Sequence, residues 1–265
     1  MKAENDKYYT PIYLANYCWE KVRGKINLAD ITEIIEPSCG DGSFYHFERK
    51  PDCGYDIEPL CDFRNVIQAD FLSQQLNYLK GRLIIGNPPY GKCMNMAQRF
   101  YRKAVEIADY IAFILPIGQL NNTHSLYQFD LIYSEDLGKH IYSGRELHCC
   151  LNIYKRPKSG KVNKKPKSTL KAITIIRDDQ KEFANANYDI RMCYWGDGTA
   201  GKILKPDEHY AAEYKIIIND KANKEVIMDF FKKFDWKGYL KCIAMRKIQK
   251  FHIVDALANN IKGIE

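Results

Sequence analysis

IIEPSCGDGSF, residues 34–44, is an apolar strand followed by an acidic residue and a glycine-bearing loop. In a doubly wound sheet, a loop of this kind lies at the carboxyl end of the first strand, where ligands bind. Gly40 and Gly42 allow the backbone to approach a ligand closely. The loop carries Glu36 and Asp41 but no positive charge, so it favours a ligand with an ammonium group, such as S-adenosylmethionine, over a pyrophosphate. An ordinary glycine turn is the alternative.

A second polar loop follows another apolar run. Residues 83–86, LIIG, lead directly into Asn87-Pro88-Pro89-Tyr90. Proline has a fixed φ and no N–H, so this loop is stiff and the preceding carbonyl is free to accept a hydrogen bond. Such a loop can hold the hydrogens of a planar amine while a ring covers its face, as methyl transfer to an exocyclic amine requires. An Asn-Pro turn that closes a strand is the alternative.

The two loops together resemble a known family. Glu-Pro-x-Cys-Gly-x-Gly-x-Phe followed by Asn-Pro-Pro-Tyr is similar to the DNA adenine-N6 methyltransferases of the gamma arrangement, in which the cofactor-binding motif precedes the catalytic one. Thr10-Pro11 resembles the N-terminal motif that closes over the methionine end of the cofactor. The resemblance covers residues 8–156. It implies a Rossmann-like α/β fold of S-adenosylmethionine-dependent methyltransferases, with a doubly wound, mostly parallel seven-stranded sheet.

The resemblance also implies roles for single residues toward S-adenosyl-L-methionine. Glu36 is expected to hold the ammonium group, and Asp56 the ribose hydroxyls. Asp56 lies 20 residues after Glu36, the separation typical of a strand–helix–strand unit, and Glu58 is the competing candidate. Asp70 and Phe71 are expected to bind and cover the adenine. The full expected cofactor-binding set is Thr10, Pro11, Glu36, Ser38, Gly40, Gly42, Phe44, Asp56, Asp70, Phe71 and Asn87.

The implied catalytic residues are Asn87, Pro88, Pro89 and Tyr90. Asn87 and the backbone of Pro88 are expected to hold the target amine, while Tyr90 stacks on the target base and Tyr154 supplies a second aromatic ring. Because a sulfonium is already a strong methyl donor, catalysis is expected to consist mainly of alignment and of hydrogen bonds to the developing charge. Neither an acid–base dyad nor a metal is expected.

The formal net charge of +7 is unevenly distributed. In residues 155–171, KRPKSGKVNKKPKSTLK, eight of 17 residues are basic and none is acidic. This composition predicts an exposed loop that contacts a phosphate backbone, with a solvated linker as the alternative. The predicted partner is nucleic acid, in the first place double-stranded DNA. The residues expected to contact it are Tyr90, Tyr154, Lys155, Lys158, Lys161, Lys164 and Lys165.

The predicted organisation is a catalytic domain (1–156), a basic loop (157–171) and a small α+β region for DNA recognition (172–265). Residues 121–144 are expected to hold an edge strand and a mobile loop. Residues 194–202, YWGDGTAGK, predict either a nucleic-acid contact through Trp195 and Lys202 or a plain hairpin turn. Arg246, Lys247 and Lys250 form a basic cluster. Helices are predicted at 12–24, 95–108, 221–234 and 240–261, and strands at 33–36, 53–57, 66–69, 82–86, 110–115, 149–155, 172–176 and 211–218.

Composition excludes several classes of protein. No apolar run approaches the roughly 20 residues of a membrane span, and the first residues lack a signal-peptide core. The nine cysteines are scattered, without a Cys-x-x-Cys pair, which favours a cytoplasmic protein over a disulfide framework or zinc site. DNA adenine methylation, site-specific or relaxed, is the leading hypothesis. RNA adenine-N6 methylation, protein glutamine methylation and a non-catalytic nucleic-acid-binding module are the alternatives.

Overall fold

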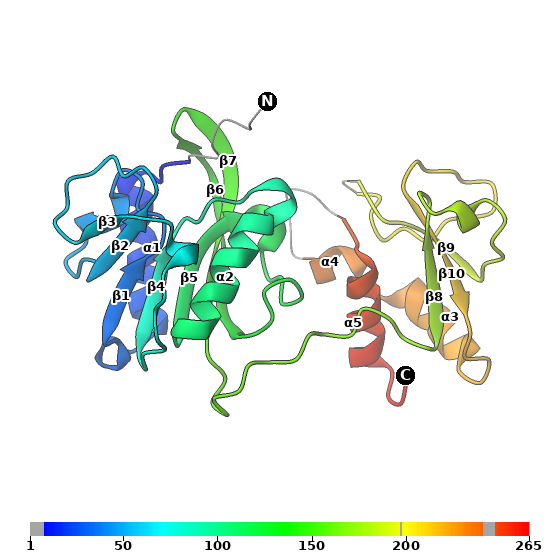
Figure 1. Ribbon diagram of the computed structural model, residues 1–265. Helices are drawn as coiled ribbons and strands as arrows, with labels where there is room; N and C mark the ends of the chain where they lie inside the picture. The colour runs from blue at the N-terminus through cyan, green and yellow to red at the C-terminus, as the bar shows by residue number, and fades with distance from the viewer. Residues whose placement is uncertain (1–7, 197, 241–246, 265) are drawn as a thin grey trace. The chain divides into compact units, whose positions relative to one another are not determined.

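The computed structural model describes residues 8–196, 198–240 and 247–264. The chain divides into two compact units, Met1–Lys165 and Pro166–Glu265, the first coloured blue to green and the second yellow-green to red in Figure 1. The boundary between the units falls inside the basic loop that the sequence predicts at 157–171.

A seven-stranded sheet is the framework of the first unit. Its strands are β1 (Glu33–Glu36), β2 (Cys53–Asp56), β3 (Val66–Gln68), β4 (Arg82–Gly86), β5 (Tyr110–Pro116), β6 (Asp130–Tyr142) and β7 (Arg145–Lys155). Their order is β3-β2-β1-β4-β5-β7-β6, and only β7 runs antiparallel to its neighbours. The predicted doubly wound, mostly parallel seven-stranded sheet is confirmed.

The strand order determines where ligands can bind. The chain moves outward from β1 to β2 and β3, and then returns to the other side of β1 to form β4. This reversal makes the carboxyl ends of β1 and β4 a topological switch point, where open α/β sheets bind their ligands. Ile35 of β1 is in register with Ile84 of β4. The loops that follow these strands, at 37–42 and 87–90, therefore begin side by side.

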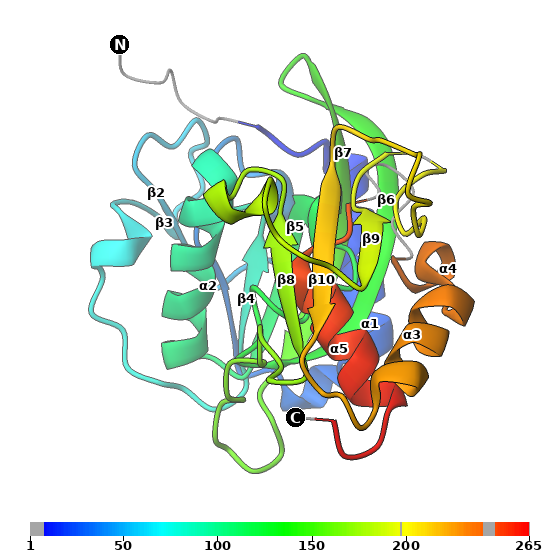
Figure 2. The same ribbon diagram turned by 90° about the vertical axis from the view of Figure 1, so that its right-hand side faces the viewer.

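Two α-helices cover opposite faces of this sheet, as Figures 1 and 2 show. Helix α1 (Ile12–Lys25) buries Leu14, Cys18 and Val22, which follow helical spacing. Helix α2 (Asn95–Ile107) buries a face that includes Phe100 and Ala104. Between residues 8 and 165 the structure also describes five short 3₁₀ helices: η1 (Leu28–Asp30), η2 (Ser43–His46), η3 (Phe71–Ser73), η4 (Lys92–Met94) and η5 (Ile117–Gln119).

Strands β6 and β7 form a long hairpin that the sequence predicts only in part. Ser143 and Gly144 make its turn with φ values of 48° and 81°, the positive values that a tight hairpin turn requires. Strand β7 pairs with β5 only along Cys149–Lys155. The hairpin therefore extends past β5 as a two-stranded ribbon. The edge strand expected within 121–144 is confirmed as β6.

The second unit has its own sheet and its own hydrophobic core. Strands β8 (Ile173–Arg177), β10 (Glu213–Ile218) and β9 (Ile190–Cys193) form an antiparallel sheet in that order. The apolar side chains of this sheet pack with those of α3 (Lys224–Lys233) and α5 (Lys250–Asn260). Arg191 and Glu213 form a buried ion pair at 2.8 Å. The remaining elements are η6 (Lys181–Phe183) and α4 (Trp236–Leu240).

Two predictions for the second unit need correction. The sequence does not predict β9, because its four residues follow a polar stretch. The single helix expected at 240–261 is wrong at residues 247–249, which are not helical, and α5 begins only at Lys250. Arg246, one member of the predicted basic cluster, lies outside the described residues. Among the helices described, none combines the length and the apolar composition that a membrane span requires.

Candidate active site

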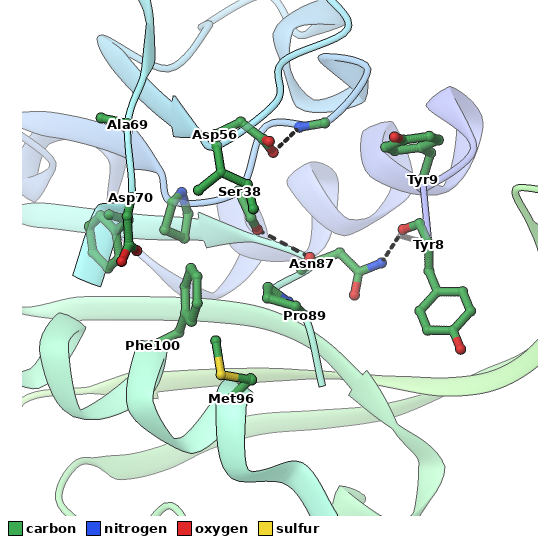
Figure 3. A pocket seen from close by; sticks show the side chains of 14 residues that line it. Tyr8, Tyr9, Ser38, Asp56, Ala69, Asp70, Asn87, Pro89, Met96 and Phe100 are labelled. Carbon is green, nitrogen blue, oxygen red and sulfur yellow. Dashed lines mark hydrogen bonds between the residues drawn. The ribbon is translucent and has the colours of Figure 1, made fainter. Parts of the chain in front are cut away.

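A cavity of about 410 Å³ opens at the switch point of the first unit. Its volume lies within the range typical of small-molecule sites. The loops after β1, β2, β3 and β4, the start of α2 and the segment before α1 form its wall, part of which Figure 3 shows. The lining residues are Tyr8, Tyr9, Pro37, Ser38, Gly40, Asp56, Ile57, Ala69, Asp70, Phe71, Asn87, Pro89, Met96 and Phe100.

The carboxamide of Asn87 is held in one orientation. Its Nδ2 donates to the backbone oxygen of Tyr8 at 3.0 Å and to Thr10 Oγ1 at 3.2 Å. A backbone carbonyl can only accept, so the nitrogen must face Tyr8, and the oxygen faces away from it (Figure 3). Asn87 Oδ1 is buried and has no hydrogen-bond partner among the described residues. The site therefore contains a fixed acceptor that is left for a donor from outside the chain.

Glu36 supplies a second acceptor of this kind. The residue is 1% exposed, and its Oε2 has no hydrogen-bond partner within the described part of the chain. Burial raises the pKa of this carboxyl well above its ordinary value of 4.5, and the nearby charges of Asp41 and Asp56 add to the effect. A buried carboxylate without a counter-ion is costly. The position is therefore suited to a cationic group.

Glu36 lies close to the start of the Asn87 loop, although it is buried behind the cavity wall and is not one of the lining residues. A Cβ placed on Gly86, the residue before Asn87, would lie 3.9 Å from Glu36 Oε1. Ser38 Oγ also donates to the backbone oxygen of Asn87 at 3.2 Å, which joins the loop after β1 to the loop after β4 (Figure 3). The sequence predicts that these two loops act together, and the structure brings them into direct contact.

Of the two candidate acids after β2, Asp56 lines the cavity and Glu58 does not. Asp56 Oδ2 accepts from the backbone N–H of Gly40, and Oδ1 accepts from that of Glu58, both at 2.8 Å. These bonds fix the carboxylate, and each oxygen keeps a lone pair that can accept a hydroxyl. Asp56 is therefore in a position suited to its predicted role.

An aromatic wall lies beside the loop after β3. Phe71 is buried and stacks on Phe100 of α2, with ring centroids 5.7 Å apart and planes at 24°. Asp70 Oδ1 accepts from the backbone N–H of Leu72 at 2.9 Å. The sequence places Phe100 only in the apolar face of α2, and its part in the cavity wall follows from the tertiary fold. Ile57, 60% exposed, is a further apolar lining residue that the sequence does not single out.

The segment before α1 also contributes to the cavity wall. A Cβ on Gly40 would lie 2.7 Å from the ring of Tyr9, so this ring packs directly against the backbone of the loop after β1. Gly40 has φ +51°, which glycine adopts easily. Thr10 contacts Asn87, and Pro11 precedes α1. Tyr8 and Tyr9 could not be recognised from the sequence, because they have no motif spacing of their own.

Tyr90 lies next to the cavity but is only 9% exposed. Its hydroxyl is 3.4 Å from Cys149 Sγ, and burial raises its pKa well above the ordinary value of 10.0. The ring of Tyr8 stacks on it, with centroids 6.0 Å apart and planes at 25°. The stack that the sequence predicts between Tyr90 and a base is therefore made, in this structure, with a tyrosine.

Three expected site residues lie elsewhere. Tyr154 was expected against the target base, which is wrong, because it is 0% exposed and packs edge-on against Tyr101 of α2. Strand β7 is paired on both sides, and the residues around Tyr154 are buried. Phe44 is buried in the core, and Gly42 packs against Phe63. Neither residue lines the cavity.

The basic loop leaves much of its charge available to solvent. Four predicted contacts, Lys158, Lys161, Lys164 and Lys165, are exposed. In the structure as described, none of the four forms an ion pair with a carboxylate. Lys155 is half-buried, and its Nζ lies 5.4 Å from the ring centroid of Tyr110. The phosphate contacts of these lysines remain predictions.

In the second unit, Trp195 and Lys202, the two predicted nucleic-acid contacts at the glycine-rich tip, differ in how accessible their side chains are. The side chain of Trp195 is 54% exposed, whereas Lys202 Nζ is paired with Glu208 at 2.7 Å. The sequence predicts either nucleic-acid contact or a plain turn here, and both possibilities remain. Asp197, at the centre of the predicted turn, lies outside the described residues.

No family model and no curated protein matches the chain. Among solved structures, a protein of Thermoplasma acidophilum is 16% identical with a TM-score of 0.45, covering 59% of this chain and 93% of that one. A putative RNA methyltransferase from Pyrococcus horikoshii is 15% identical with a TM-score of 0.42, covering 56% and 86%. A putative class I S-adenosylmethionine-dependent methyltransferase from Listeria monocytogenes is 14% identical with a TM-score of 0.43, covering 62% and 65%.

Likenesses at this level concern the fold alone. The strand order β3-β2-β1-β4-β5-β7-β6 with a single antiparallel strand gives the first unit the Rossmann-like fold of S-adenosylmethionine-dependent methyltransferases. This agrees with the fold that the sequence resemblance implies.

Proposed function

We propose that the protein transfers a methyl group from S-adenosylmethionine to the exocyclic amine of adenine in DNA. The observation that carries the proposal is the Asn87 carboxamide, whose oxygen is buried, fixed and without a partner among the residues described. An acceptor in this state, at the switch point of the sheet, suits an N–H donor that enters with the substrate. Adenine carries such a donor in its 6-amino group.

The residues in and beside the cavity fit the proposed cofactor. Glu36 offers its unpartnered carboxylate oxygen to the ammonium group, and Asp56 is available to the ribose hydroxyls. The wall of Phe71 and Phe100 suits the face of the adenine ring. When bound, S-adenosylmethionine supplies an activated methyl group whose sulfonium leaves as a neutral thioether.

In the proposed reaction the chain mainly orients the amine. Asn87 Oδ1 accepts one amine hydrogen, and the carbonyl of Pro88 accepts the other. Both bonds favour a tetrahedral nitrogen whose lone pair points at the methyl carbon. The bound cofactor would supply the methyl group: the nitrogen would bond to the methyl carbon, and the electron pair of the broken carbon–sulfur bond would go to sulfur. The positive charge that develops on nitrogen strengthens both hydrogen bonds, and the amine then loses one proton to water.

Two features support a nucleic acid as substrate. Four exposed lysines of the basic loop, Lys158, Lys161, Lys164 and Lys165, form no ion pair with a carboxylate in the part of the chain that is described, and they suit a polyanion. Adenine within a duplex must be turned out of the stack to reach a buried acceptor. Asn87 Oδ1 is such a buried acceptor, so an adenine of a duplex would have to leave the stack to reach it. DNA is our leading substrate because the loop motifs resemble DNA adenine methyltransferases.

The test uses cofactor with a labelled methyl group and separate pools of random-sequence duplex DNA, RNA and protein. After digestion of the DNA to nucleosides, mass spectrometry should find the label in N6-methyldeoxyadenosine. Label in RNA alone would move the substrate to RNA, and label in protein alone would move it to an amide nitrogen. Absence of label from every pool, with a folded protein that binds the cofactor, would contradict methyl transfer.

A further inference from the structure

We infer that Tyr8 is the second aromatic ring that encloses the target base, on the face opposite Tyr90. This inference rests on the proposed function, because it concerns the base that brings its amine to Asn87. Tyr8, in the segment before α1, then takes the role that the family resemblance implies for Tyr154, whose ring is buried in the core.

Tyr8, Tyr90 and Asn87 form one connected group. The two tyrosine rings are stacked at a centroid distance of 6.0 Å. The backbone oxygen of Tyr8 accepts from Asn87 Nδ2 at 3.0 Å, and Figure 3 shows the Tyr8 side chain beside Asn87 at the edge of the cavity. A base whose amine reaches Asn87 and whose face meets Tyr90 therefore enters beside Tyr8.

The spacing of the rings shows that the slot is closed. Atoms in contact are about 3.5 Å apart, so a base between two parallel rings needs them about 7 Å apart. The present centroid distance is 6.0 Å. Tyr8 consequently occupies the place of the base and has to shift outward as the base enters. After that shift its ring is placed to cover the second face of the base, in a stack of tyrosine, base and tyrosine.

The outer side of Tyr8 is attached to the tip of the β6–β7 hairpin. The guanidinium carbon of Arg145 lies 5.9 Å from the centre of the Tyr8 ring, and its Nη1 is 3.5 Å from the hydroxyl. The backbone N–H of Tyr9 donates to Ser143 Oγ at 2.8 Å. This part of the hairpin is not paired with β5. The tip can therefore follow Tyr8 when the ring moves, and Arg145 lies where it can contact a phosphate of the incoming strand.

The other aromatic rings of the cavity wall have different neighbours. Tyr9 lies against the backbone of Gly40, on the side of the loop after β1. Phe71 and Phe100 pack on each other. Among the described lining residues, Tyr8 is thus the ring that faces Tyr90.

The test compares the wild type with Tyr8→Ala and Tyr8→Phe. Tyr17→Ala is the matched control, because Tyr17 is an exposed tyrosine of α1 that hydrogen-bonds to Glu135 and does not line the cavity. Initial rates are measured on the random-sequence DNA pool, with S-adenosylmethionine affinity measured separately by calorimetry. Loss of one stacking ring should lower kcat/KM for DNA by about 10- to 100-fold.

The expected pattern is a lower kcat/KM for Tyr8→Ala, near wild-type values for Tyr8→Phe and Tyr17→Ala, and unchanged cofactor affinity in all. Equal or faster methylation by Tyr8→Ala would overturn the inference, because the ring would then only block the entry of the base and would not stack on it. Equal loss in Tyr8→Ala and Tyr8→Phe would also overturn it, because the hydroxyl and not the ring would be responsible. A wild type that binds cofactor but labels no nucleic acid would instead refute the proposed function.

Discussion

Replacing Glu36 by glutamine should weaken S-adenosylmethionine binding while leaving the fold intact. Glu36→Gln keeps the shape of the side chain and removes the charge that the ammonium group would meet. A hydrogen bond to a charged group contributes about 1.5–3 kcal/mol. At about 1.4 kcal/mol per factor of ten, the dissociation constant should rise about 10- to 100-fold. The substitution removes a buried carboxyl whose pKa is raised, so the melting temperature of the ligand-free variant should not fall below that of the wild type.

The raised pKa of Glu36 also predicts how stability and cofactor affinity change with pH. In the ligand-free protein the pKa of Glu36 lies well above its ordinary value of 4.5. The folded state then binds this proton more tightly than the unfolded state, so stability should fall as pH rises from 4.5 through the raised pKa. The ammonium group favours the ionised form, so cofactor affinity should rise over the same range. Binding should therefore release a proton from Glu36.

Calorimetry in two buffers of different ionisation enthalpy measures both the affinity and the proton release. Glu48→Gln is the control, because Glu48 is exposed and lies outside the cavity. If Glu36→Gln bound the cofactor as tightly as the wild type, with the same proton release, Glu36 would not be the anchor. A large fall in its melting temperature would show instead that the ionised carboxylate stabilises the fold.

Three further predictions concern the cavity and the basic loop. Asp56→Asn should weaken cofactor binding measured by calorimetry, whereas Glu58→Gln should not, and the reverse would move the ribose contact to Glu58. Replacing Lys161 and Lys164 by alanine should lower the slope of log KM for DNA against log salt by about 2, one phosphate contact each, and an unchanged slope would show that neither lysine contacts phosphate. Gly40→Ala should lower the free energy of unfolding in urea by about 1–2 kcal/mol, because φ there is positive, and an unchanged value would show that the loop relaxes freely.

The sheet could be predicted from the sequence because its parallel strands are short apolar runs, each followed by a polar loop. The runs at 33–36 and 82–86 lie within a residue of their observed bounds. The outer hairpin was harder to predict. All but one of the 13 residues of strand β6 are exposed or half-buried, because the strand lies at the sheet edge and its last four residues, 139–142, extend past β5. Such a strand lacks a continuous apolar run.

The site could be predicted as far as its loop motifs extend. Glu36, Asp56 and Asn87 belong to motifs, and the structure places all three in or beside one cavity. Tyr8 could not be predicted, because its role depends on how the chain passes over Asn87 before α1 begins. Tyr154 shows the opposite error. The expectation for Tyr154 came from the family resemblance alone, and it fails because Tyr101 of α2 packs on this ring and buries it.

The rate of methyl transfer by Asn87→Ala decides whether the Asn87 oxygen holds the target amine. With saturating cofactor and the random-sequence DNA pool, kcat should fall by at least about 100-fold, the loss typical of removing one fixed hydrogen-bonding group from a transition state. The affinity for S-adenosylmethionine should remain close to that of the wild type. A variant that methylates adenine at the wild-type rate would show that the Asn87 oxygen does not hold the amine and would contradict the proposed mechanism.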